Sequence, residues 1–244
     1  NDHIHTYGNI PFDLNIGSTT FGGYFENESV NLKTEAELSS LPFLSPYITN
    51  LDSTAGNYKI FLNVKGPSEN LTRDGNISIQ NGILYTQLLN DPIRLINGEA
   101  QLINNKLRIK NLSANLNIES AENVGKKISN THISGEINLN KFFNPHYNLK
   151  LKSQNASFRL LFLDIHGETN LDLSIFGRDT VYISGKIEPE EVNVFYEFAT
   201  EDIGTSIAED QNTLMSYNLN IPFRNRAFFQ NSQIDAEITG ELNL

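Results

Sequence analysis

The sequence predicts an all-β fold, a long curled sheet of antiparallel or mixed strands with at most one or two short helices. Three observations lead to this prediction. Apolar and polar residues alternate with a period of two along much of the chain, as in strands with one buried face. The segment ISGEINL at 133–139 returns as ITGELNL at 238–244. Helix signals, by contrast, are scarce.

The alternating segments define one apolar face, which we expect to be the inner face of the sheet. In NLKLK, for example, Leu149 and Leu151 alternate with asparagine and lysine. Successive side chains of a strand point to opposite faces, so polar residues such as Glu136 and Glu241 should face solvent. The residues predicted to face inward are Ile133, Ile137, Leu139, Leu149, Leu151, Leu171, Leu173, Ile175, Val181, Ile183, Leu219, Ile221, Ile238, Leu242 and Leu244.

The repeated heptapeptide generalises to the pattern apolar-x-Gly-x-x-x-Leu. It fits INGEAQL at 96–102 and IHGETNL at 165–171, and its first half fits ISGKIEP at 183–189. Glycine then lies on the apolar face, where the missing side chain would let a sheet curl tightly. The alternative, which the pattern alone favours, is that Ile-x-Gly marks the ends of strands.

One turn can be placed closely. Asn104-Asn105 lies between two alternating runs, and asparagine tolerates the positive φ angles of a type I′ hairpin turn. The predicted hairpin pairs Leu102 with Leu107 and Ala100 with Ile109.

The best helix candidate is TEAELSSLPFL at 34–44. Thr34 can cap its N-terminus, two glutamates suit its first turn, and Pro42 would end it. The acidic segment 201–212 predicts a loop.

Composition and charge exclude several classes of protein. The 244 residues carry a formal net charge of −11 and form no strong cluster of lysine and arginine, so nucleic-acid binding is not expected. The chain has no cysteine, which excludes disulfides and thiolate metal sites. No apolar run has the length of a membrane-spanning helix. We expect one elongated unit over 1–244, a fragment of a larger protein, with a soft division near 140–146.

Motifs for catalysis are lacking, and the sequence predicts neither an enzyme nor a bound cofactor or metal. It contains no nucleophile elbow and no phosphate-binding glycine loop. His3 and His5 would share a strand face, but no third ligand lies near them in sequence. The acidic pairs 190–191 and 201–202 lack the spacing of a calcium loop. Aromatic residues at 142–143, 195–198 and 228–229 are assigned to the core or to a hydrophobic groove.

Two segments together resemble the TamB and AsmA-like family. Residues 38–116 match the order of parts in the family's repeat unit: a leucine-rich segment ending near Leu44, a strand from Gly56 to Gly66, the run Gly75-x-Ile77-x-Ile79-x-Asn81-Gly82, then Pro92-Ile93, Asn97-Gly98 and the hairpin ending at Leu112. Residues 216–244 are similar to the late part of TamB, where an alternating strand and an aromatic stretch precede IDAEITGELNL. The segments KGPSENL at 65–71 and 201–212 depart from the family pattern.

The resemblance implies a fold and a function. Family members are bacterial envelope proteins, anchored in the inner membrane and extending through the periplasm as a curled sheet called a β-taco. They are associated with moving phospholipid between membranes and with outer-membrane biogenesis. TamB itself partners an outer-membrane barrel of the insertase superfamily. For this chain the resemblance implies a periplasmic location and acyl chains bound on the apolar face, whose inward-facing residues would line a groove. From the usual strand spacing, about fifteen to twenty strands would make that groove roughly 70–95 Å long.

Three alternatives stay open from the sequence. The chain could be a closed β-sandwich that serves as an adhesin or carbohydrate-binding module, with an exposed aromatic platform. It could be an enzyme on a β-scaffold, such as a polysaccharide lyase, although no converging acid and base are found. It could also carry lipopolysaccharide rather than phospholipid in a similar groove.

Overall fold

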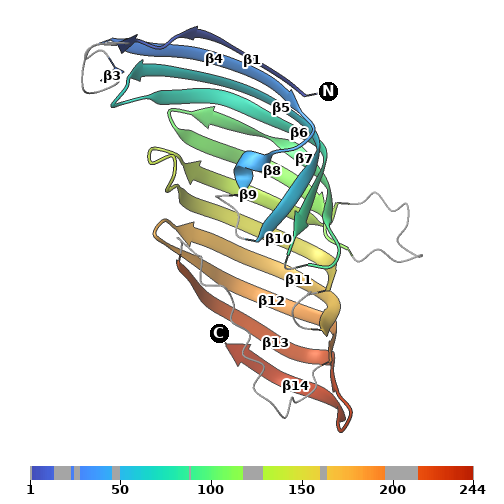
Figure 1. Cartoon of the computed structure of the whole chain (residues 1–244). Coiled ribbons are helices and arrows are strands. Elements are labelled where there is room, and N and C mark those ends of the chain that lie inside the picture. Colours follow the sequence, from blue (N-terminus) through green and yellow to red (C-terminus); the bar gives the residue numbers. More distant parts are fainter. Residues whose placement is uncertain are drawn as a thin grey trace.

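The computed structural model describes residues 2–13, 23–24, 28–45, 50–87, 89–117, 129–159, 164–195 and 214–243. These residues form one twelve-stranded sheet in the order β1-β4-β5-β6-β7-β8-β9-β10-β11-β12-β13-β14, and a separate pair β2-β3 (Figure 1). The strands are β1 (His3–Asn9), β2 (Phe12–Asp13), β3 (Gly23–Tyr24), β4 (Ser29–Leu38), β5 (Leu51–Pro67), β6 (Thr72–Thr86), β7 (Ile93–Ile103), β8 (Lys106–Asn115), β9 (Thr131–Asn138), β10 (His146–Arg159), β11 (Asp164–Gly177), β12 (Thr180–Phe195), β13 (Leu214–Gln230) and β14 (Asp235–Asn243).

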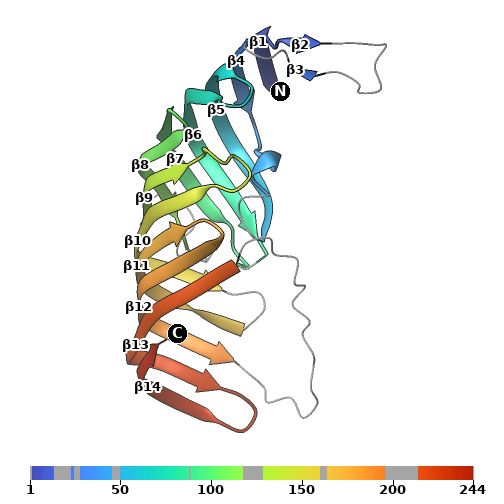
Figure 2. The ribbon, with the colours of Figure 1, turned by 90° about the vertical axis from the view of Figure 1, so that its left-hand side faces the viewer.

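The large sheet is a single curled layer, as the sequence predicted (Figures 1 and 2). Within the described residues, no second sheet or long helix packs against it. Its strands follow one another nearly in chain order and pair antiparallel, apart from the parallel pair β12-β13. A parallel pair needs a long crossover connection, and residues 196–213 lie between these two strands. Over the described part of the chain, no helix is long and apolar enough to cross a membrane.

The sheet has fewer strands than the expected fifteen to twenty, because single strands are longer than the alternating runs suggested. Both β5 and β13 have 17 residues. At a strand spacing of about 4.8 Å, twelve strands extend for about 53 Å. The soft division expected near 140–146 corresponds to the connection between β9 and β10, two neighbours in the same sheet.

The hairpin prediction at 104–105 is confirmed. Leu102 pairs with Leu107 and Ala100 with Ile109. The turn residues have φ angles of 48° and 64°, as a type I′ turn requires. Asn105 is also buried, and its side-chain amide donates to the Leu71 carbonyl oxygen at 3.1 Å. Its backbone N–H donates to the Arg73 carbonyl oxygen of β6 at 3.1 Å, so the turn is also held against β6.

The helix prediction at 34–44 is wrong. Residues 34–38 belong to β4, and only a short 3₁₀ helix, η1 (Pro42–Leu44), follows. Thr34 faces Thr6 of β1, and Pro42 begins the 3₁₀ helix instead of ending a longer helix. The reason is tertiary, because β4 alternates throughout and finds strand partners on both sides, in β1 and β5.

A line of β-bulges crosses the sheet and bends its strands. The register shifts at Ile79/Gly82 in β6, Ile109/Leu112 in β8 and Ser153/Ala156 in β10, and it shifts again in β11, β12 and β13. Bulges bend a strand locally and often place a residue at positive φ. Asn81, Asn155 and Arg226, with φ of 51°, 49° and 52°, lie in this line. Figure 2 shows the resulting curl.

Small side chains are buried at the bend although no second layer covers them. Ala156 is 0% exposed, and Ala227 and Thr169 are both 2% exposed. The strand register places all three on the face that carries the predicted apolar residues. When strands bend, the parts of the sheet on the two sides of the bend cover residues on the inner, concave face. Because these three small side chains are covered, we infer that the apolar face is the inner face.

A polar network joins the strands at the same place. Thr131 and Ser153 lie side by side with their hydroxyl oxygens 2.7 Å apart, and the Ser153 hydroxyl donates to the Asn130 carbonyl oxygen at 3.1 Å. The Asn130 amide in turn donates to the Leu116 carbonyl oxygen at 3.1 Å. Such buried groups are stable because they are paired.

Enlarging a side chain at the bend should destabilise the sheet. We expect Ala156→Leu to lower the free energy of unfolding by about 1 to 3 kcal/mol, because the fully buried site has no room for three more carbon atoms. Urea unfolding followed by circular dichroism measures this. The matched control, Gln154→Leu on the exposed side of the same strand, should change stability little. Equal losses in both variants would contradict the tight bend.

Candidate functional site: an open apolar face

The candidate site is the inner face of the sheet, where cross-strand register aligns apolar residues into continuous rows. Residues that are direct register partners lie on the same face of a sheet. The central row runs from β1 to β13 and contains only aliphatic residues, one glycine and one tyrosine. Its members are Ile4, Ala36, Ile60, Ile77, Ala100, Ile109, Gly135, Leu149, Ile175, Ile183 and Tyr217.

A second row lies beside the first, nearer the bend, and is also free of polar side chains apart from one tyrosine hydroxyl. It consists of Tyr58, Ile79, Gly98, Leu112, Ile133, Leu151, Leu173, Gly185 and Leu219. On the other side, a third row runs from Thr6 and Thr34 to Leu62, Gly75, Leu102, Leu107, Ile137, Tyr147, Gly177, Val181 and Met215.

The residues predicted to face inward gather on this one face. The register places Ile133, Ile137, Leu149, Leu151, Leu171, Leu173, Ile175, Val181, Ile183, Leu219, Ile221, Ile238 and Leu242 there. Leu139 follows β9, and its backbone N–H donates to the Asn105 carbonyl oxygen at 2.7 Å. Leu244 lies outside the described residues. That these side chains bind lipid stays a prediction.

The apolar face is only partly covered. None of the isoleucines or phenylalanines whose burial the structure describes is buried, and most of the buried hydrophobic residues are alanine or valine. Tyr217 is 51% exposed, and in the last strand Ile238 and Leu242 are 38% and 43% exposed. An apolar surface of this length makes the inner face the candidate binding site of the structure.

The glycines of the repeated motif lie in the middle of strands, not at their ends. Gly135 is central in β9 and Gly185 in β12, both on the apolar face. Gly135 has φ of 133°, and a Cβ atom there would lie 2.2 Å from the Asn148 carbonyl oxygen of β10. The motif therefore allows close approach of neighbouring backbones, and the strand-end interpretation is wrong for these positions.

The opposite face carries the charged residues, many of them in cross-strand ion pairs. Lys59 Nζ lies 2.8 Å from Glu37 Oε1, and this hydrogen bond and charge lower the pKa of Glu37. Burial raises the pKa of Glu136, but hydrogen bonds from Arg108, at 3.2 Å, and Lys106 outweigh it and lower that pKa. Glu136 is thus on the outer face, as predicted.

The other residues singled out in the sequence do not converge. His3 and His5 share one face of β1 and are exposed, and the described residues contain no group of three or more side chains suited to a metal. Phe143 is 90% exposed in a turn. Glu241 is exposed and accepts a hydrogen bond from the Asn220 amide. Residues 196, 198 and 201–212 lie outside the described part.

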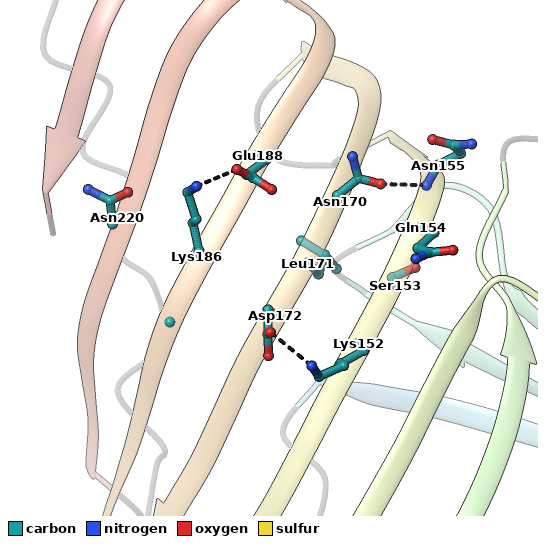
Figure 3. Close-up of a pocket in the computed structure, with 11 residues that line it drawn as sticks. Lys152, Ser153, Gln154, Asn155, Asn170, Leu171, Asp172, Lys186, Glu188 and Asn220 are labelled. Carbon is teal, nitrogen blue, oxygen red and sulfur yellow. Dashed lines mark hydrogen bonds and ion pairs between the residues drawn. The ribbon is translucent and has the colours of Figure 1, made fainter.

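A feature that sequence reasoning missed is a hollow of about 740 Å³ on the outer face, across β10 to β13 (Figure 3). Amide side chains and two ion pairs line it. Lys152 Nζ lies 3.1 Å from Asp172 Oδ2, and Lys186 pairs with Glu188. Lys152 and Asp172 come from different strands and share no motif, so only the register reveals that they are neighbours.

Comparisons of the chain with protein-family models, with curated proteins and with solved structures find no match. The function is therefore argued from the geometry of the two faces.

The two copies of the repeated heptapeptide offer a matched test of the role of glycine. Both glycines have positive φ, but a Cβ atom at Gly135 would clash with the neighbouring backbone, whereas at Gly240 no atom of the described residues lies within 4 Å of the Cβ position. We expect Gly135→Ala to lower the free energy of unfolding by about 3 kcal/mol or more, and Gly240→Ala by clearly less. Denaturant unfolding measures both. Similar losses would show that close strand approach does not constrain Gly135.

Proposed function

We propose that this chain is a periplasmic lipid-binding segment of a bridge that moves phospholipid between the inner and outer bacterial membranes. Acyl chains would bind along the inner apolar face, and movement along it would contribute to outer-membrane biogenesis. The observation that carries the proposal is the central row, which stays apolar from Ile4 in β1 to Tyr217 in β13.

The dimensions of the face suit acyl chains. The rows run across the strands, so a chain lying on one row passes a new strand about every 4.8 Å. Burying one methylene contributes about 0.8 kcal/mol, so a 16-carbon chain could gain on the order of 12 kcal/mol before ordering costs. An extended chain of that length covers roughly four strands, well within the twelve of the sheet.

The repetition of the face suits movement as well as binding. Each strand offers similar aliphatic contacts, so neighbouring positions should have similar affinity and no single position should trap the ligand. The repeated motif supplies two such strands, β9 and β14. Glycines interrupt all three rows, and they leave shallow depressions between the larger side chains. These glycines are Gly75, Gly98, Gly135, Gly177 and Gly185.

The resemblance to the TamB and AsmA-like family supports the same proposal. It adds an anchor in the inner membrane and an outer-membrane barrel of the insertase superfamily as partner, both through the parent protein. The alternative of a closed sandwich finds little support, because the described strands of the large sheet form one layer. Phospholipid and lipopolysaccharide share acyl chains, so the test must separate them.

Native mass spectrometry of the purified chain, followed by solvent extraction and lipid analysis, tests the proposal. We expect phospholipid-sized adducts on the 27.4 kDa chain, and phospholipid in the extract. Adducts with the mass of lipopolysaccharide would change the cargo but keep the groove. A protein free of lipid under mild conditions, and unable to take up phospholipid from vesicles, would refute the proposal.

A single charge on the inner face should remove lipid binding. Leu173 lies in the second row, and aspartate there would place a carboxylate against the acyl chain, at a cost that prevents binding at that strand. The same holds for Ile183→Asp in the central row. We expect adducts to fall by about tenfold or more, a loss of about 1.4 kcal/mol.

The matched controls are Ser174→Asp and Ser184→Asp, which place the same charge one residue further on, on the outer face. They should bind lipid as the unmodified protein does. Circular dichroism checks that all four variants keep the sheet. Unchanged lipid binding in folded Leu173→Asp and Ile183→Asp would contradict the assignment of the inner face.

A further inference from the structure

We propose that the outer face of β10 to β13 is a binding site for a neutral oligosaccharide. The proposed site, called the outer track here, consists of the hollow around Lys152 and Asp172, a pair of serines, and a pair of exposed aromatic rings. It lies on the opposite face from the apolar rows, so it does not rest on the proposed lipid function.

The aromatic end of the outer track carries two exposed aromatic rings within a polar face. Phe176 and Tyr182 are direct register partners on β11 and β12, and they are 51% and 52% exposed. His146 of β10 lies against Phe176 edge to face, with ring centroids 4.8 Å apart. Aromatic rings held on a rigid sheet suit the C–H faces of pyranose rings, because the ring face is apolar and electron-rich.

Serines connect the rings to the hollow. Ser174 and Ser184 are register partners, two residues along their strands from Phe176 and Tyr182, and Asp172 and Lys186 are the next pair. Small hydroxyl side chains leave the middle of the outer track shallow and able to form hydrogen bonds. From the rings to the hollow the track is four residues long, about 13 Å, which suits several linked sugar rings.

The polar groups in the hollow favour a neutral ligand. Its lysines are paired with carboxylates, Lys152 with Asp172 at 3.1 Å and Lys186 with Glu188, so no excess of either charge is left for an anion or a cation. The volume of about 740 Å³ is within the usual range for small-molecule sites. Hydroxyl groups both donate and accept hydrogen bonds, which matches a mixed set of amides, ammonium groups and carboxylates.

Two amides at the rim are available for a ligand. The side chains of Gln154 and Asn155 are exposed and make no hydrogen bond with the described residues (Figure 3). Their neighbour Asn170 is held in place, because its oxygen accepts from the Asn155 backbone N–H at 2.9 Å and its nitrogen donates to Glu190 at 2.7 Å. The bulge in β10 holds Asn155 at positive φ, which orients this part of the rim.

Isothermal titration calorimetry with the purified chain tests the assignment. The probes are β-linked glucose and N-acetylglucosamine hexamers as neutral ligands, and a galacturonic acid hexamer as an anionic one. We expect at least one neutral hexamer to bind, and more tightly than the anionic hexamer. Failure of both neutral hexamers to bind, or preference for the anionic one, would overturn the proposal.

Variants place the binding on the outer track. We expect Phe176→Ala with Tyr182→Ala, and separately Gln154→Ala with Asn155→Gly, to weaken binding by about tenfold or more. Glycine at 155 keeps the positive φ without strain. The control Tyr217→Ala removes an equally exposed ring from the inner face and should bind as the unmodified protein does.

Leu173→Asp separates the two proposals. It should lose lipid but keep the hexamer, because Leu173 faces the inner side. If both double variants of the outer track remain folded by circular dichroism and still bind the hexamer, the outer-track proposal is wrong. This outcome does not depend on whether the lipid proposal holds.

Discussion

The register of the backbone hydrogen-bond ladder is the constraint on which the rest of this structure depends. The described strands form a single layer, so cross-strand neighbours supply most of the contacts that a second layer would otherwise supply. A slip of one residue would turn an apolar row to the outer face and a charged row to the inner face. Ion pairs between register partners on the outer face, such as Lys152 with Asp172 and Arg108 with Glu136, oppose such a slip.

The line of bulges explains how one layer can carry a long apolar face in water. A flat sheet would expose that face along its whole length, with a high risk of aggregation. The bulges bend the strands, so the arms shield the residues at the bottom, among them Ala156 and Thr169. The side chains there are small because larger ones would force the arms apart, and the polar groups there are hydrogen-bonded to each other.

The two faces of the sheet separate two kinds of chemistry. The inner face offers aliphatic contacts that repeat from strand to strand, which suits a ligand that is apolar and long. The outer face offers charge pairs, amides and a few exposed rings, which suit a polar ligand with apolar surfaces. If both proposals hold, a glycan on the outer face could fix the position of the sheet while lipid moves along the inner face, because the sheet backbone separates the two sites.

Features that depend on short-range periodicity could be predicted from the sequence alone. Alternation predicted the all-β class, and it assigned residues such as Leu149, Ile175 and Ile183 to a common face, because a strand has a fixed period of two. The hairpin at Asn104-Asn105 was equally local. Long-range pairing, which no local pattern predicted, makes residues 34–38 a strand between β1 and β5, pairs β12 with β13 in parallel and places the motif glycines mid-strand. It alone brought Phe176 beside Tyr182 and Lys152 beside Asp172. These features depend on pairing between distant segments, and local preference carries no information about which strand will be the neighbour.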